Sequence, residues 1–175
     1  MRNATVTTIA PTGSLHLIAD TSSGIEPLFA LASTRRIGNR SVPLIHPLLK
    51  NYLTSLDNSE EILAEVKRTG SLASSPVPDE VKDLYQTAPE ISPDHHIRMQ
   101  AAFQKHVDNA VSKTVNLPED AGPEEIGRIY LLARSLGCKG VTAYRYNSKT
   151  DQVLLRGCTV CGDDSLSGYN FLTGT

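Results

Sequence analysis

The sequence has few cysteines, no strong excess of either charge and no long apolar run, and each shortage excludes a class of protein. Three cysteines in 175 residues are too few for a disulfide framework, which indicates a reducing compartment. A formal charge of −2 gives no basic face for nucleic acid or for an anionic membrane. No apolar run approaches the roughly 20 residues that span a bilayer, and the first residues, MRNATVTT, carry no apolar signal segment. We therefore expect a cytoplasmic protein with no membrane and no nucleic acid among its partners.

The N-terminal end combines a strand-like segment with two turns that are rich in hydroxyl side chains. Residues 4–9 alternate hydroxyl and apolar side chains, which predicts a strand that ends at Pro11. Residues 15–19 are apolar, and both a short helix and a second strand remain open for them. A second turn follows at residues 21–24. The first turn consists of Pro11, Thr12, Gly13 and Ser14.

The first turn has the composition of an anion site. It offers backbone N–H groups, two hydroxyls and a close approach at Gly13 to one point, and a helix beginning at Ser14 would add its dipole. Phosphate is the natural ligand for such a turn. The alternative is a plain turn in which Ser14 caps a helix. A Walker-type phosphate loop is excluded, because no Gly-Lys-Ser/Thr follows.

Caps and stop signals predict three helices in the middle of the chain. HPLLKNYLTSL has Pro47 in its first turn, and NSEEILAEVKRTG has Asn58 or Ser59 as cap and Gly70 as stop. The third, SPDHHIRMQAAFQKHVDNAV, has Ser92 as cap. Its apolar residues recur every four positions, and we expect them to form its buried face. These residues are Met99, Phe103 and Val107.

The segment from 110 to 146 predicts a strand, a helix and a second strand. AVSKTVNLP and GVTAYRY are strand-like, and GPEEIGRIYLLARSLG between them begins at Pro123 and stops at Gly137. Short connections make this a βαβ unit, so we expect a parallel pair with a right-handed crossover. The apolar face of this helix is predicted to contain Ile126, Ile129, Tyr130, Ala133 and Leu136.

The histidines and cysteines give one redox candidate and no metal site. No pair of histidines has metal-ligand spacing, and we expect the three in the 92–111 helix segment to lie on its surface. Cys158 and Cys161 form a CxxC pair, which suits a reversible disulfide or half of a zinc site. Redox use is favoured, because only Cys138 remains and we expect that residue to be small, apolar and buried. The histidines are His16, His46, His95, His96 and His106.

Several segments in the same order resemble one family. RNATVTTIAPTGSL, SSGIEPLFAL, ISPDHHIRMQAAFQKHVDNAVSKTVNLP and LGCKGVTAYRY are similar to successive blocks of adenosylcobalamin-dependent (class II) ribonucleotide reductases. The blocks belong to the C-terminal half of the catalytic chain, and the resemblance covers residues 2–154.

The resemblance implies a fold and a site. The fold would be α/β, the C-terminal portion of a ten-stranded α/β barrel with βαβ units in residues 1–155, followed by a flexible tail in residues 156–175. The loop of Pro11, Thr12, Gly13 and Ser14 would grip the phosphates of the ribonucleotide substrate. Cys158 and Cys161 would be a thiol relay that re-reduces an active-site disulfide.

The resemblance also implies partners and a role in making deoxyribonucleotides for DNA synthesis. The cofactor would be adenosylcobalamin, bound mainly by parts of the enzyme that this chain lacks. The partners would be the remaining N-terminal portion of the reductase and a thioredoxin-like reductant. The Asn-x-Cys-x-Glu radical loop of the family does not occur in the sequence, so we expect the isolated chain to be inactive. The alternative is a non-catalytic nucleotide-binding or interaction fragment.

Overall fold

The computed structural model describes residues 2–19, 21–37, 40–149 and 154–158, which fall into two compact units. The first unit contains the described residues of Met1–Pro27 and Ala88–Thr150. The second contains those of Leu28–Thr87 and Asp151–Thr175. None of the described helices is long and apolar enough to cross a membrane.

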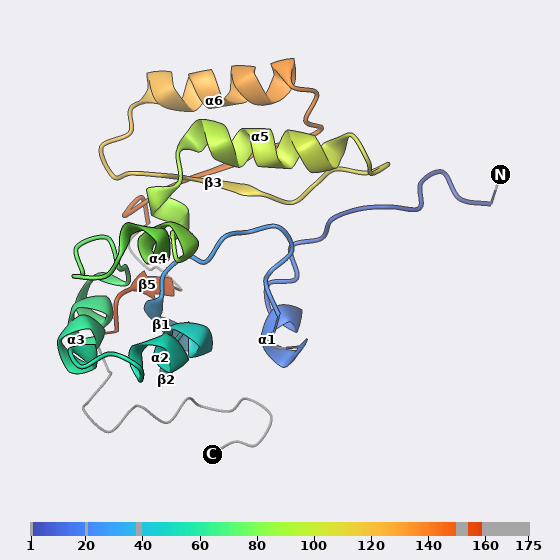
Figure 1. Cartoon of the computed structure of the whole chain (residues 1–175). Helices are drawn as coiled ribbons and strands as arrows, with labels where there is room; N and C mark the ends of the chain where they lie inside the picture. Colours follow the sequence, from blue (N-terminus) through green and yellow to red (C-terminus); the bar gives the residue numbers. More distant parts are fainter. Residues whose placement is uncertain (1, 20, 38–39, 150–153, 159–175) are drawn as a thin grey trace. The chain divides into compact units, whose positions relative to one another are not determined.

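The first unit is built around a parallel pair of strands. Strand β3 (Thr114–Leu117) pairs in parallel with β4 (Thr142–Arg145), and helix α6 (Pro123–Ser135) connects them. Helix α5 (Pro93–Gln104) lies beside α6 and against β3, as Figure 1 shows. The predicted βαβ unit is therefore confirmed. The unit also contains α1 (Leu15–Ala19) and the 3-10 turn η1 (Ala88–Glu90).

Local signals explain where these helices begin and end. The Ser92 hydroxyl accepts the backbone N–H of His95 at 3.3 Å, and proline occupies the first position of α5. Helix α6 likewise begins with proline and two glutamates, and Gly137 follows its end with a φ of 78°. Of the two structures left open for residues 15–19, the chain adopts the helix.

The core of the first unit lies between α5, α6 and the parallel strands. Six of its residues are buried: Ile97, Val115, Leu117, Ala121, Ile129 and Ala133. On α6 the predicted apolar face is correct except at Tyr130, which is 49% exposed.

The buried face of α5 differs from the prediction. Met99 and Phe103 are each 40% exposed, and the helix ends at Gln104, before Val107. Its buried residues are His96, Ile97, Gln100, Ala101 and Gln104. The difference arises because polar side chains on this face find hydrogen-bond partners in the interior. The Gln100 amide donates to the carbonyls of Val111 and Gly140 at 3.0 and 2.7 Å, so this face holds loops as well as apolar side chains.

The predicted strand at residues 4–9 is not formed. The segment makes a single parallel bridge, between Ile9 and Val111. The backbone N–H groups of Asn109 and Ser112 donate to Thr7 and Ile9 at 3.0 and 2.9 Å. These partners lie in the loop after α5, which bends, so a longer ladder cannot form.

The second unit is an antiparallel sheet covered by helices. Strands β2 (Arg40–Ile45), β1 (Ala32–Ile37) and β5 (Leu154–Arg156) lie in that order. Helices α2 (Pro47–Leu53) and α3 (Ser59–Thr69) match the predictions, and α4 (Asp79–Leu84) was not predicted. Their core consists of Leu31, Ala32, Leu49, Leu53, Ile62, Val66, Leu72 and Val77.

The β1–β2 hairpin and β5 were also not predicted. Gly38-Asn39 between the first two strands is a sequence pattern typical of two-residue hairpin loops. Strand β5 pairs with β1, and the Cys158 N–H donates to the Lys67 carbonyl at 2.7 Å. Residues 156–158, the first of the expected tail, are therefore part of the second unit. The rest of the expected tail, residues 159–175, lies outside the described residues.

The α/β content agrees with the expected fold class. The described residues form one three-stranded and one two-stranded sheet, and these described strands do not close a barrel.

The link between β5 and α3 predicts a sharp requirement for glycine at position 157. Gly157 has a φ of 80°, and a Cβ there would lie 2.7 Å from the Arg68 carbonyl oxygen. We expect Gly157→Ala to lower the free energy of unfolding by at least about 1–2 kcal/mol, the cost of a left-handed alanine. Urea unfolding measures this change. Gly127→Ala is the matched control, because a Cβ there meets nothing within 4 Å and lies in a helix. It should stabilise by about 0.5–1 kcal/mol, and equal effects of the two variants would contradict the contact.

Candidate functional site

The first hydroxyl turn has a strained and unsatisfied residue at its centre. Thr12 has a φ of 47°, a left-handed conformation that β-branched residues rarely adopt. Its Oγ1 is buried and has no hydrogen-bond partner among the described residues. Strained backbone and an orphaned buried hydroxyl are both typical of ligand sites. Helix α1 has five residues, so the dipole expected behind this turn is small.

The second turn packs directly on the first. The Ser23 hydroxyl donates to the Pro11 carbonyl at 2.6 Å. Gly24 has a φ of 58°, and a Cβ there would lie 3.0 Å from the Ala10 carbonyl oxygen. Two small-residue turns close together in sequence thus form one double turn, in which the second supports the first. We call residues 11–14 the phosphate loop, after the ligand that the sequence analysis expects for them, and residues 21–27 the support turn.

The segment before the phosphate loop is held by Asp108. One carboxylate oxygen accepts the N–H groups of Val6 and Thr7, at 3.0 and 3.2 Å, and the Thr7 hydroxyl at 3.1 Å. These hydrogen bonds, with the N–H of Val6 contributing most, lower the pKa of Asp108. The loop after α5 therefore fixes the chain that enters the phosphate loop.

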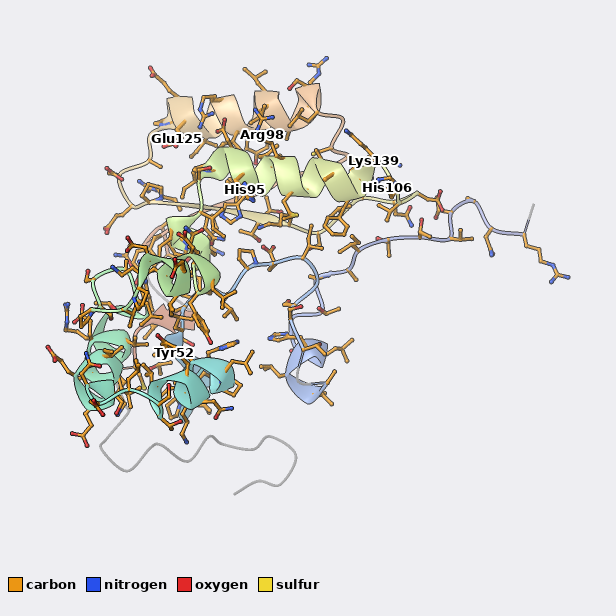
Figure 2. The ribbon with its side chains drawn as sticks, viewed as in Figure 1. Tyr52, His95, Arg98, His106, Glu125 and Lys139 are labelled. Carbon is orange, nitrogen blue, oxygen red and sulfur yellow. The ribbon has the colours of Figure 1, made fainter. Side chains whose placement is uncertain are left out.

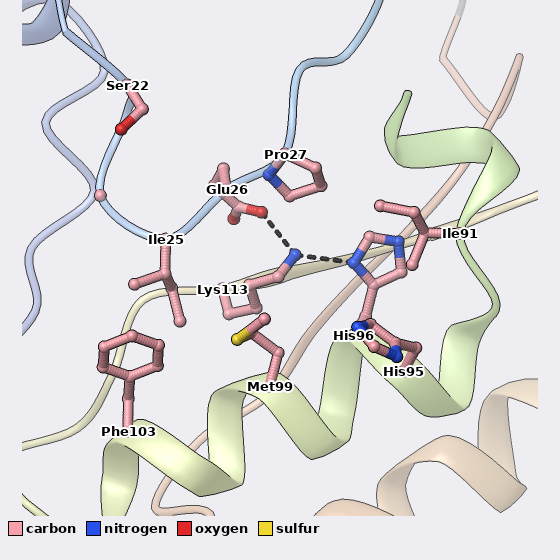
Figure 3. Close-up of a pocket in the computed structure, with 11 residues that line it drawn as sticks. Ser22, Ile25, Glu26, Pro27, Ile91, His95, His96, Met99, Phe103 and Lys113 are labelled. Carbon is pink, nitrogen blue, oxygen red and sulfur yellow. Dashed lines mark hydrogen bonds and ion pairs between the residues drawn. The ribbon is translucent and has the colours of Figure 1, made fainter. Parts of the chain in front are cut away.

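The support turn is tied to β3 by a buried lysine. The Lys113 ammonium donates to Glu26 Oε2 at 2.6 Å, to His96 Nδ1 at 2.8 Å and to the Thr114 carbonyl at 2.7 Å (Figure 3). Its side chain is only 1% exposed. An ammonium has three N–H donors, and here each has an acceptor. The other carboxylate oxygen of Glu26 accepts the Thr114 N–H at 2.5 Å. We call Lys113, His96 and Glu26, whose side chain is 23% exposed, the triad.

His96 is neutral in this arrangement. Nε2 lies 3.0 Å from the Ala88 carbonyl oxygen, so it carries the proton, and Nδ1 accepts from Lys113. Burial, together with the positive charge of Lys113, lowers the pKa of His96 below its ordinary value of 6.5. Burial also lowers the pKa of Lys113, and the hydrogen bond and charge of Glu26 oppose this shift.

The triad forms the polar wall of a pocket of about 350 Å³. Ile25, Met99 and Phe103 form much of the apolar wall, as Figure 3 shows. The exposed stripe of α5 therefore faces this pocket. The complete lining is Ser22, Gly24, Ile25, Glu26, Pro27, Ile91, His95, His96, Met99, Phe103 and Lys113.

The remaining histidines and cysteines are scattered. His95 and His106 are exposed (Figure 2), whereas His96 is 1% exposed, so its predicted surface position is wrong. Cys138 is half-buried against the first core, and burial raises the pKa of its thiol. Cys158 is disulfide-bonded and belongs to the second unit, while Cys161 lies outside the described residues. Among the described residues no group of histidine, cysteine and carboxylate side chains could hold a metal ion.

A family model described as "Ribonucleotide reductase, barrel domain" matches residues 1–144. The chain belongs to this family. A protein of Thermoplasma acidophilum named vitamin B12-dependent ribonucleoside-diphosphate reductase is 48% identical over 159 residues, which are 90% of this chain and 21% of the relative. A Mycobacterium tuberculosis protein of the same name is 45% identical over 155 residues, 87% of this chain and 22% of its own length.

More distant relatives carry a similar name. A Streptomyces coelicolor protein named vitamin B12-dependent ribonucleotide reductase is 34% identical over 163 residues, 87% of this chain and 17% of its own length. The chain therefore spans about a fifth of the length of the curated reductases that it matches.

Sequence reasoning missed the triad of this family member, although one signal for it was present. Residues 111, 113, 115 and 117 alternate with their neighbours and are all buried. A lysine at one inward position of such a strand requires a buried acceptor, usually a carboxylate. The sequence does not say which carboxylate, because Glu26 is 87 residues away.

The triad predicts coupled effects on stability. Glu26→Gln leaves a buried ammonium without its counter-charge, and we expect the free energy of unfolding to fall by about 3 kcal/mol. Lys113→Met should also destabilise, because it leaves His96 Nδ1 without its donor. The double variant should lose clearly less than the sum of both, measured by urea unfolding followed at amides of the first unit. Additive losses would contradict a direct pair.

Proposed function

We propose that this chain is part of an adenosylcobalamin-dependent ribonucleotide reductase, which converts ribonucleoside diphosphates to deoxyribonucleotides for DNA synthesis. The chain contributes strands and helices to the ten-stranded α/β barrel of that enzyme, and its phosphate loop binds the substrate phosphates. The observation that carries the proposal is Thr12, whose strained backbone and orphaned hydroxyl lie at the centre of the turn for which the family resemblance implies phosphate binding.

The chemistry of the phosphate loop suits a phosphoryl oxygen. Thr12 Oγ1 is a donor that lacks a partner among the described residues, and the neighbouring Ser14 side chain is exposed. A Cβ on Gly13 would meet nothing within 4 Å, so the space beside the loop is open to a ligand. A phosphate accepts several hydrogen bonds at once and satisfies such donors with charge assistance.

The pocket beside the triad does not fit the cofactor named in the relatives. The pocket beside the triad has about 350 Å³, near the lower limit of pockets for drug-sized ligands, and a corrin with its adenosyl group is far larger. We infer, as the family resemblance implies, that adenosylcobalamin is bound mainly by the remaining portion of the enzyme.

Phosphate binding is testable in an assembled enzyme in which this chain replaces the matching 159 residues of the Thermoplasma relative. Ser14→Ala with Gly13→Val should raise the KM for the nucleoside diphosphate, and losing one charge-assisted hydrogen bond costs roughly 1.5–3 kcal/mol. The fold should be unaffected, because position 13 has room for a side chain. Leu131→Ala, at a 68% exposed position of α6, is a control that should leave KM unchanged. A correctly folded double variant with normal KM would exclude this loop as the phosphate site.

The thiol relay proposal concerns Cys158 and Cys161. In the relay the two thiols give two electrons and two protons to the active-site disulfide, become a disulfide themselves and are reduced by a thioredoxin-like dithiol. CxxC spacing supports such a cycle, and Cys158 is disulfide-bonded. The Cys158 N–H is bound to the Lys67 carbonyl of α3. The relay therefore requires either that this hydrogen bond opens or that Cys158 reacts while it remains bound to α3.

The relay predicts a difference between reductants. Changing both cysteines to serine in the assembled enzyme should abolish turnover with thioredoxin, whereas a small dithiol that diffuses into the site should still support it. Full thioredoxin-driven activity, or one zinc per chain lost with the same changes, would exclude the relay. The 175-residue chain alone is the negative control, because it lacks the radical loop motif. Failure of the assembled enzyme to turn over at all would favour a non-catalytic nucleotide-binding fragment.

A further inference from the structure

The phosphate loop is held from both sides by one short stretch of chain. On its entering side, Asp108 binds the N–H groups of residues 6 and 7. On its leaving side, the support turn is bound by Lys113 and by the Thr114 N–H. Residues 108–114 therefore form a common base under the double turn.

An unbroken series of hydrogen bonds connects residues 108–114 with Pro11, the neighbour of the strained Thr12. Glu26 receives Lys113 on one carboxylate oxygen and the Thr114 N–H on the other. Its own N–H donates to the Ser23 carbonyl at 3.0 Å, and the Ser23 hydroxyl donates to Pro11. Pro11 precedes Thr12, the residue with the positive φ. A left-handed β-branched residue persists only where its surroundings fix it.

The hydrogen bonds of Lys113 depend on the protonation state of His96. The Lys113 ammonium needs Nδ1 of a neutral imidazole as its third acceptor. The charged and titratable groups that face the imidazole are Lys113, Glu26 and His95, and the Ala88 carbonyl of η1 faces Nε2. Protonation at Nδ1 would place an N–H donor against the ammonium and break the contact.

We propose that Glu26 is a positioning residue for phosphate binding, which acts through Ser23 to hold Thr12 in its left-handed conformation and is itself fixed by Lys113 and neutral His96. This inference rests on the proposed phosphate loop and assigns a role to the Gly-Ile-Glu-Pro segment that follows it.

The conformation of the loop is measured first, without ligand, in the 175-residue chain. The HN–Hα coupling and the carbon shifts of Thr12 report its left-handed population by NMR. We expect Glu26→Gln to reduce this population, because the glutamine NH2 group replaces one carboxylate oxygen and, as a donor, cannot accept from Lys113 or from the Thr114 N–H at that position. Ser23→Ala, which removes only the bond to Pro11, should reduce it as well. Two controls should not: Glu124→Gln, which removes the same charge from the exposed first turn of α6, and Thr21→Ala, at an exposed position of the support turn.

The second measurement is binding of inorganic pyrophosphate to the same variants. If only the left-handed form binds, the apparent Kd rises in inverse proportion to its population, so a fall to about one tenth gives a roughly tenfold weaker Kd. A variant that only loosened the fold would not follow this relation. If the wild-type chain does not bind pyrophosphate, the proposed phosphate loop is wrong, while the Thr12 signals still decide the positioning role.

The third measurement is the ligand-free Thr12 signal against pH. As pH falls below 6.5, His96 titrates with its lowered pKa, and the left-handed population should fall with it. The Asp108 anchor is lost only below pH 3.8, because its hydrogen bonds lower the pKa of Asp108 from that ordinary value. Unchanged Thr12 signals in both Glu26→Gln and Ser23→Ala would overturn the proposal. If Glu26→Gln fails to fold, Ser23→Ala decides alone.

Discussion

The first unit depends on the interaction between the buried ammonium group of Lys113 and the carboxylate of Glu26. Taking this charge out of water carries a large desolvation penalty, and the lowered pKa of Lys113 shows that burial outweighs the attraction of Glu26. The charge is tolerated because all three of its N–H groups are used and because Glu26 in turn has a second donor. A buried ion pair of this kind adds little net stability compared with an apolar contact. The ion pair instead fixes the position of the segment that carries the Glu26 carboxylate.

That carboxylate is carried by a turn, which explains why the position matters. An apolar contact between the support turn and β3 would leave the turn free to slide, because such contacts have no direction. Glu26, bound at both oxygens, fixes the turn in translation and in rotation. The support turn in turn positions the phosphate loop, because Gly24 packs closely on the backbone of Ala10 and the Ser23 hydroxyl donates to the Pro11 carbonyl. The same stretch of chain also holds the entering segment through Asp108, so the loop is defined at both ends.

The accuracy of the sequence predictions follows the distance over which each signal acts. The caps at Ser92 and Gly70 and the proline at position 123 act within one helical turn, and those helices are where the sequence predicts them. The hairpin of β1 and β2 was missed, because a polar composition hid strands whose pairing is set by a two-residue loop. The buried face of α5 was misjudged, because glutamines at 100 and 104 find acceptors that no periodicity reveals. The composition of the first hydroxyl turn predicted an anion site, which stays a prediction, but nothing in the sequence indicated the contacts that hold this turn. The link between residues 26 and 113 crosses 87 positions, and only the fold brings them together.

The strain at Thr12 gives this support its purpose. A left-handed threonine costs of order 1–3 kcal/mol, and its buried hydroxyl adds the penalty of an unmade hydrogen bond. An isolated turn would relax and lose both costs. The double turn cannot, because relaxation at Thr12 would have to move Pro11, then Ser23, and finally a carboxylate that is bound to a buried charge. A loop held in this way does not need to be ordered when a ligand arrives, so less of the binding free energy is spent on fixing it. In the proposed phosphate complex a phosphate oxygen accepts from the Thr12 hydroxyl, and binding removes the penalty of the unmade hydrogen bond. The cost of burying Lys113 is the same with and without ligand, so it lowers the stability of the fold and leaves the affinity of the loop unchanged.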